Sequence, residues 1–187
     1  MNRDDAWALL CEFTQSEGLR KHGLAVEAAM RHLARKESED EELWGIVGML
    51  HDFDYEQHPR IEEHARAGAR ILRERGWPEV VARAIESHSD HTGVPRESLM
   101  EKTLFAVDEL AGFITAVALV KPNKSVFEVD VPSVRKKMKD KAFARAVSRD
   151  DIINGVASLG VDFDAHVAAV IEALKDAADA LGLRGGA

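Results

Sequence analysis

Residues 43–54 read LWGIVGMLHDFD and combine an apolar run with a cluster of ionisable side chains. The run up to Leu50 is apolar on all sides, which is typical of a helix buried at the centre of a bundle. His51 and Asp52 follow this run directly. Burying a charge is costly unless the charge is paired or binds a metal. The stretch therefore predicts a buried helix that ends in a polar or metal-binding site.

Helical periodicity extends over most of the chain on both sides of this stretch. The sequence predicts a first helix up to about residue 18 and further helices over about 20–36, 41–51, 60–75, 78–88, 97–120 and 149–159. A short basic helix is expected after Pro132, and a last helix is expected to begin at Asp162 or Asp164. Residues 125–131 alternate between apolar and polar and predict a short extended piece. The predicted fold class is all-α, a compact bundle of several helices.

Composition predicts one globular domain that binds neither nucleic acid polymers nor anionic membranes. The chain has 187 residues, of which 45% are apolar and 31% charged, and its formal net charge is -8. This charge argues against nucleic acid polymers and anionic membranes as partners. No run approaches the roughly 20 apolar residues of a membrane span. The single cysteine cannot form an internal disulfide, so a cytoplasmic location is expected. The oligomeric state stays open, because the apolar stripe of the last helix can pack internally or against a second subunit.

Six ionisable residues recur at helix ends or inside apolar helices, where a lone charge is unfavourable. They lie at the start of the second predicted helix, at the end of the third, in the fourth, at the end of the fifth and in the apolar stretch LFAVDELAGFI, and they are His22, His51, Asp52, His64, His88 and Asp108. A divalent metal would neutralise the carboxylates and accept neutral imidazoles. The pattern therefore favours a shared metal site.

A histidine, an adjacent His-Asp pair and a distant aspartate, here His22, His51-Asp52 and Asp108, resemble the pattern of the HD-domain superfamily of metal-dependent phosphohydrolases. The segments EEHARAGARIL (62–72) and VARAIESHSDH (81–91) resemble those that supply additional histidines in two-metal members. The resemblance covers about residues 20–115, so that residues 116–183 form a C-terminal helical extension of a single domain spanning 1–187. It implies a helix bundle of the HD-domain type.

The resemblance also implies how these residues act. His22, His51, Asp52 and Asp108 would hold one metal, and Asp52 would bridge to a second metal held by His64 and His88. Position 89 is a serine where two-metal members often have a histidine, and whether His91 replaces it is left open. The mixed ligand set favours Mn, Fe, Co, Ni or Zn over Mg, with one or two ions per chain.

The implied activity is hydrolysis of a phosphate monoester or diester by a metal-bound hydroxide, with Asp52 and His51 as catalytic residues. The expected partner is a small phosphate ester or a nucleotide. Two alternatives remain: a di-iron oxygenase of the same superfamily, and a metal-binding regulatory module without turnover. Substrate contacts are predicted for Asp54, Tyr55, His91, Lys121 and Lys124. By contrast, the basic residues of 135–141 are expected to form a solvated face, and His32, His58 and His166 to lie at the surface.

Overall fold

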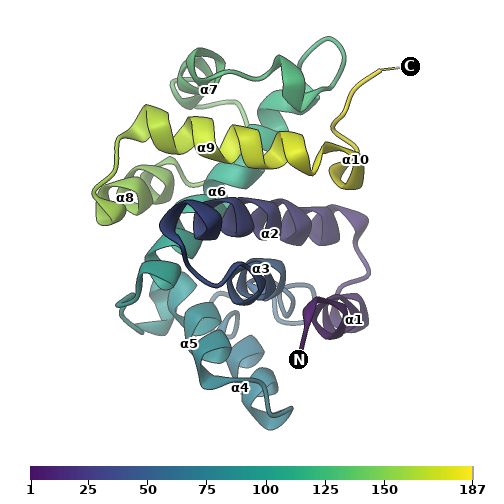
Figure 1. The fold of residues 1–187 in the computed structure, drawn as a ribbon, viewed down its shortest axis with the longest axis vertical. Coiled ribbons are helices and arrows are strands. Elements are labelled where there is room, and N and C mark those ends of the chain that lie inside the picture. The colour runs from purple at the N-terminus through teal and green to yellow at the C-terminus, as the bar shows by residue number, and fades with distance from the viewer. Residues whose placement is uncertain (187) are drawn as a thin grey trace.

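The computed structural model describes residues 1–186, and within that range all regular structure is helical (Figure 1). The α-helices are α1 Arg3–Phe13, α2 Glu17–Glu37, α3 Glu41–Leu50, α4 Arg66–Glu74, α5 Glu79–His88, α6 Leu99–Leu119, α7 Val131–Met138, α8 Arg149–Leu159, α9 Phe163–Asp176 and α10 Ala178–Leu181. Two 3₁₀ turns lie at Asp90–Thr92 and Val126–Glu128. The all-α fold class is confirmed. No helix among the described residues is long and apolar enough to cross a membrane.

Polar caps set the beginnings of most helices. The Asp40 side chain accepts a hydrogen bond from Leu43 N at the start of α3, and Ser98 forms a reciprocal capping box with Glu101 at the start of α6. Ser148 caps α8 by accepting from Asp151 N. These signals are legible in the sequence, which is why most predicted boundaries lie close to the observed ones.

Helix α3 lies against α2, and glycines allow the two backbones to approach closely. A Cβ atom on Gly48 would lie 2.9 Å from Val26 O, and one on Gly23 would lie 2.8 Å from Met49 O. Residues Trp44 to Leu50 are all buried, as the apolar run predicts. The close packing brings the first turns of α2 beside the C-terminal end of α3, and thus His22 beside His51.

Helix α6 is the long central element that connects the two halves of the sequence. In Figure 1, α9 crosses it on one side, while α4 and α5 lie at the opposite end of the molecule from α7. Helix α8 also packs closely on α6, because Gly155 has no side chain. A Cβ atom on Gly155 would lie only 2.6 Å from Ala106 Cα on α6. The C-terminal helices therefore pack against α6, the helix that carries Asp108. The division into an HD core and an extension stays a prediction.

The structure corrects three local predictions. Helix α4 begins at Arg66 rather than near residue 60, because Ala65 has φ +64° and interrupts the helical backbone. His64 therefore lies in a turn. The expected extended piece at 125–131 contains a 3₁₀ turn, closed by a hydrogen bond from Val129 N to Val126 O. His166 lies in the core, not at the surface, and its Nε2 hydrogen-bonds to Ala106 O at 3.2 Å.

Candidate metal centre

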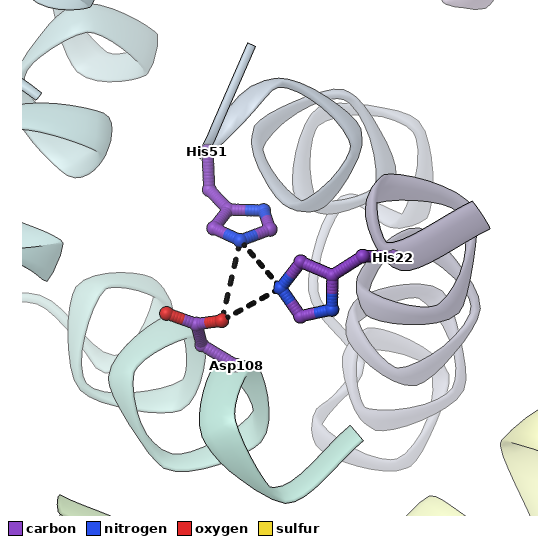
Figure 2. A group of neighbouring side chains, drawn as sticks. All are labelled: His22, His51 and Asp108. Atoms are coloured by element: carbon purple, nitrogen blue, oxygen red, sulfur yellow. Dashed lines mark hydrogen bonds and ion pairs between the residues drawn. The ribbon is translucent and has the colours of Figure 1, made fainter. Parts of the chain in front are cut away.

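One group of three ligand atoms comes from three different helices. His22 lies on α2, His51 caps the C-terminal end of α3, and Asp108 lies on α6, as Figure 2 shows. The Nε2 atoms of the two histidines are 3.2 Å apart, and Asp108 Oδ1 lies 3.0 Å from His22 Nε2 and 3.2 Å from His51 Nε2. These three atoms converge on a single point, which is the arrangement that a metal ion requires.

A second group of three ligand atoms lies beside the first. Asp52 Oδ1 is 3.0 Å from His64 Nε2 and 3.3 Å from His88 Nε2. His64 comes from the turn before α4, and His88 is the last residue of α5. The three residues form a compact set of one oxygen and two nitrogen donors.

Asp52 connects the two groups through its two carboxylate oxygens. While Oδ1 faces His64 and His88, Oδ2 lies 3.5 Å from His51 Nε2 and 4.0 Å from His22 Nε2. Each oxygen of one carboxylate thus faces a different group. The fold therefore gathers all six of the predicted ligand residues into one centre.

Backbone carbonyls orient two of the histidine rings. His51 Nδ1 donates to Gly48 O at 2.8 Å, and His88 Nδ1 donates to Ile85 O. In both cases the acceptor lies three residues earlier in the same helix. A hydrogen bond at Nδ1 leaves Nε2 as the nitrogen that faces the centre, which is the usual way in which proteins prepare imidazole ligands.

Protons on His51 and His64 offset the charge of the carboxylates. Burial alone would lower the pKa of His51, but Asp52 and Asp108 outweigh it and hold that pKa well above its usual value. Burial likewise opposes the rise at His64, where the nearby carboxylates of Asp52 and Asp54 raise the pKa to about 9. The pKa of Asp52 is held well below its usual value, because His51 overcomes the effect of burial.

A cavity of about 560 Å³ opens onto this centre. Its walls include the apolar or aromatic side chains of Tyr55, Ile61 and Phe105, and also His91 and two further carboxylates, Glu109 and Asp151. Glu109 accepts a hydrogen bond from Ser148 N at 3.1 Å, and burial together with the charge of Asp108 raises its pKa to about 7. The cavity is large enough for a small organic phosphate.

Not every predicted substrate contact lies at this cavity. Tyr55 and His91 line it, but Asp54 is fully buried and absent from its walls. Lys124 lines a separate cavity near residues 182–186, and Lys121 is not among the residues that line the central one. The prediction for these two lysines depended on the loop after α6 folding over the metal site.

Sequence reasoning missed Glu109 and Asp151 as residues of the site. Glu109 directly follows Asp108 in an apolar helix, and that position was the available signal. Asp151 follows Ser148 by three residues, which is the spacing of a helix cap, and its backbone N does donate to Ser148 Oγ. That its side chain lines the cavity depends on how α8 packs against α6, which no local pattern reveals.

The donor set fits a pair of divalent transition-metal ions. Each group offers imidazole nitrogens and a carboxylate oxygen, a mixture suited to Mn, Fe, Co, Ni or Zn. The model of the HD domain family matches residues 19–112, half of the chain. The protein therefore belongs to the HD domain family. Neither the curated proteins nor the solved structures gave a match to this chain.

Proposed function

We propose that this protein is a metal-dependent phosphohydrolase that cleaves a phosphate monoester or diester of a small molecule or nucleotide. The observation that carries the proposal is the position of Asp52 between two groups of ligand atoms, with one oxygen 3.0 Å from His64 Nε2 and the other 3.5 Å from His51 Nε2. Such a carboxylate is suited to bridge two ions held by His22, His51 and Asp108 on one side and by His64 and His88 on the other.

The residues of the centre then have distinct roles. A divalent ion, when bound, lowers the pKa of water and offsets the negative charge that accumulates on a phosphoryl oxygen. Asp52 and His51 are the residues closest to both groups, and a carboxylate of the centre is placed to accept the proton of the attacking water. The side chains of Tyr55, Ile61 and Phe105 offer apolar contact to the organic part of the substrate. The outlying Lys121 and Lys124 are not part of this proposal.

The test is release of nitrophenol by purified protein loaded separately with Mn, Fe, Co, Ni or Zn. Nitrophenyl phosphate and bis(nitrophenyl) phosphate represent the monoester and diester classes. We expect turnover with at least one metal, and a loss of at least about 100-fold in Asp52→Ala. Asp150→Ala is the matched control, because Asp150 is exposed and does not line the cavity.

Two results would contradict the proposed hydrolysis and support one of the two alternatives, a regulatory module or a di-iron oxygenase. Full metal occupancy without phosphate release from a broad ester panel would support a regulatory module. Oxygen consumption coupled to substrate cleavage, with a visible iron absorption band, would support a di-iron oxygenase. A cytoplasmic location and the exclusion of nucleic acid polymers as partners stay predictions from composition.

A further inference from the structure

His64 differs from the other buried histidines of the centre in how its second ring nitrogen is supported. His51 and His88 each donate from Nδ1 to a carbonyl of their own helix. His64 precedes α4 and lies in a turn, so it has no such helical carbonyl behind it. Its Nδ1 lies instead 3.3 Å from Asp54 Oδ1.

Asp54 is held rigidly where it lies. Its side chain is fully buried, and Oδ2 accepts hydrogen bonds from Ala65 N and Gly68 N, each at 3.1 Å. Gly68 N belongs to the first turn of α4, where the helix dipole favours a negative charge. Two backbone donors and a helix N-terminus therefore fix one oxygen and leave the other, Oδ1, directed at His64.

The two facing atoms lack partners of their own. Asp54 Oδ1 and His64 Nδ1 are two of the three buried side-chain atoms in residues 1–186 that make no hydrogen bond, and they lie opposite each other. A buried carboxylate oxygen without a donor is unfavourable. Their separation of 3.3 Å places each of these atoms within reach of the other.

The backbone directly after His64 is strained in a way that serves the same contact. Ala65 has φ +64° and ψ -40°, and Arg66 N donates to His64 O at 2.8 Å, which closes a γ-turn of the rare kind with positive φ. This turn directs His64 toward Asp52. Asp54 stabilises it by accepting from Ala65 N, so that one carboxylate supports both the turn and the ring.

Gly68 makes the close approach of Asp54 to α4 feasible. A Cβ atom at this position would lie 2.9 Å from Asp54 Oδ1 and 3.0 Å from its Cγ. Any other residue would displace the carboxylate from its place beside His64. Asp54, His64 and Gly68 therefore form a single structural unit.

We propose that Asp54 is a positioning residue that keeps the proton of His64 on Nδ1 and so presents Nε2 as a ligand to the second metal. The proposal rests on the metal centre described above. Because Asp54 reaches the metal only through His64, it would act on metal affinity rather than on the reaction itself.

Asp54→Asn separates this role from helix capping. An asparagine oxygen can still accept from Ala65 N and Gly68 N, but the atom that faces His64 becomes an NH₂ donor. This NH₂ donor would favour the His64 tautomer that carries its proton on Nε2. In that tautomer Nε2 cannot bind a metal. Asp40→Asn is the matched control, because Asp40 also caps a helix but lies outside the centre.

The experiment measures zinc per chain by elemental analysis over a range of buffered free zinc, with circular dichroism to verify the fold. We expect about two ions in the wild type and in Asp40→Asn. In Asp54→Asn we expect the first ion to be retained and the affinity for the second to fall 10–100-fold. Equal affinity of Asp54→Asn and the wild type for both ions would overturn the proposal and leave the proposed hydrolase intact. A wild type that binds no zinc would overturn the metal centre itself.

Nitrogen NMR of the zinc-loaded wild type tests the same point without a variant. The His64 ring should show a slowly exchanging proton on Nδ1 and a metal-shifted Nε2. A proton on Nε2 of His64 would overturn the proposal even if Asp54→Asn failed to fold.

Discussion

At the scale of single residues, histidine protons and a bound metal ion would neutralise the same carboxylates of the centre. Without metal, the raised pKa values of His51 and His64 show that protons offset the charge of Asp52 and Asp108. A metal ion bound as proposed would use the same Nε2 atoms and would require them to be unprotonated. Metal and protons therefore compete for these residues.

This competition predicts a steep dependence of metal uptake on pH. Because the pKa of His64 is about 9 without metal, zinc binding at pH 7 should displace its proton and release it to the buffer. We expect the apparent affinity for the second ion to rise as the pH increases from 7 toward 9, by up to about tenfold per unit for each displaced proton. Calorimetry in buffers of different ionisation enthalpy measures the released protons, and an affinity independent of pH would contradict the expectation.

At the scale of helices, the crossing of α6 and α8 depends on the absence of one side chain. A Cβ atom at Gly155 would lie 2.6 Å from Ala106 Cα and 3.1 Å from Phe105 O. Both are backbone atoms, which cannot rotate away as the end of a flexible side chain can. The two helices would have to separate, close to the point where α6 carries Asp108.

We therefore expect Gly155→Ala to lower the free energy of unfolding by about 1–3 kcal/mol, despite the higher helix propensity of alanine. Gly18→Ala is the control, because it also lies in a helix but a Cβ atom there would meet its nearest neighbour at 3.7 Å. That substitution should be neutral or stabilising by up to about 1 kcal/mol. Urea denaturation of the metal-free proteins measures both. Equal effects would show that the α6–α8 contact does not limit stability.

Local sequence signals predicted the helices well, and they failed where tertiary contacts decide. The periodicity and caps of α3 and α6 are legible in the chain, and the motif residues on them identified the centre. The early interruption at Ala65 was not predictable, because alanine favours a helix and only the hydrogen bond to Asp54 holds it at positive φ. Residue pattern alone likewise did not place Glu109 or Asp151 at the cavity.

At the scale of the whole molecule, the C-terminal helices and residues 19–112, which match the HD domain, share one interior. His166 of α9 is 4% exposed and contacts Ala106 O of α6. Sequence reasoning placed this histidine at the surface because nothing in its neighbourhood distinguishes it from a solvated one. Burial lowers its pKa, the charge of Lys36 acts in the same direction, and the Ala106 carbonyl only partly opposes them.

The lowered pKa of His166 predicts a loss of stability in mild acid. The folded state binds its proton more weakly than the unfolded state, so stability is greatest above the unfolded pKa of about 6.5 and falls as the pH decreases toward the folded pKa. We expect wild-type protein to lose more unfolding free energy between pH 7 and 5 than His166→Gln does. Urea denaturation of both metal-free proteins at several pH values measures the difference. If the unfolding free energies of the two proteins changed equally with pH, His166 would not be the group responsible.

The distance along the chain between His22 and Asp108 has a consequence in polymer terms. The two residues are 86 positions apart in sequence, yet their ligand atoms lie 3.0 Å apart. An ion held by both would be a reversible cross-link that closes a loop of this length, in a chain whose single cysteine cannot form an internal disulfide. A covalent link over roughly 100 residues removes about 4.7 kcal/mol of chain entropy from the unfolded state. Chelation would then loosen the whole fold as well as empty the site.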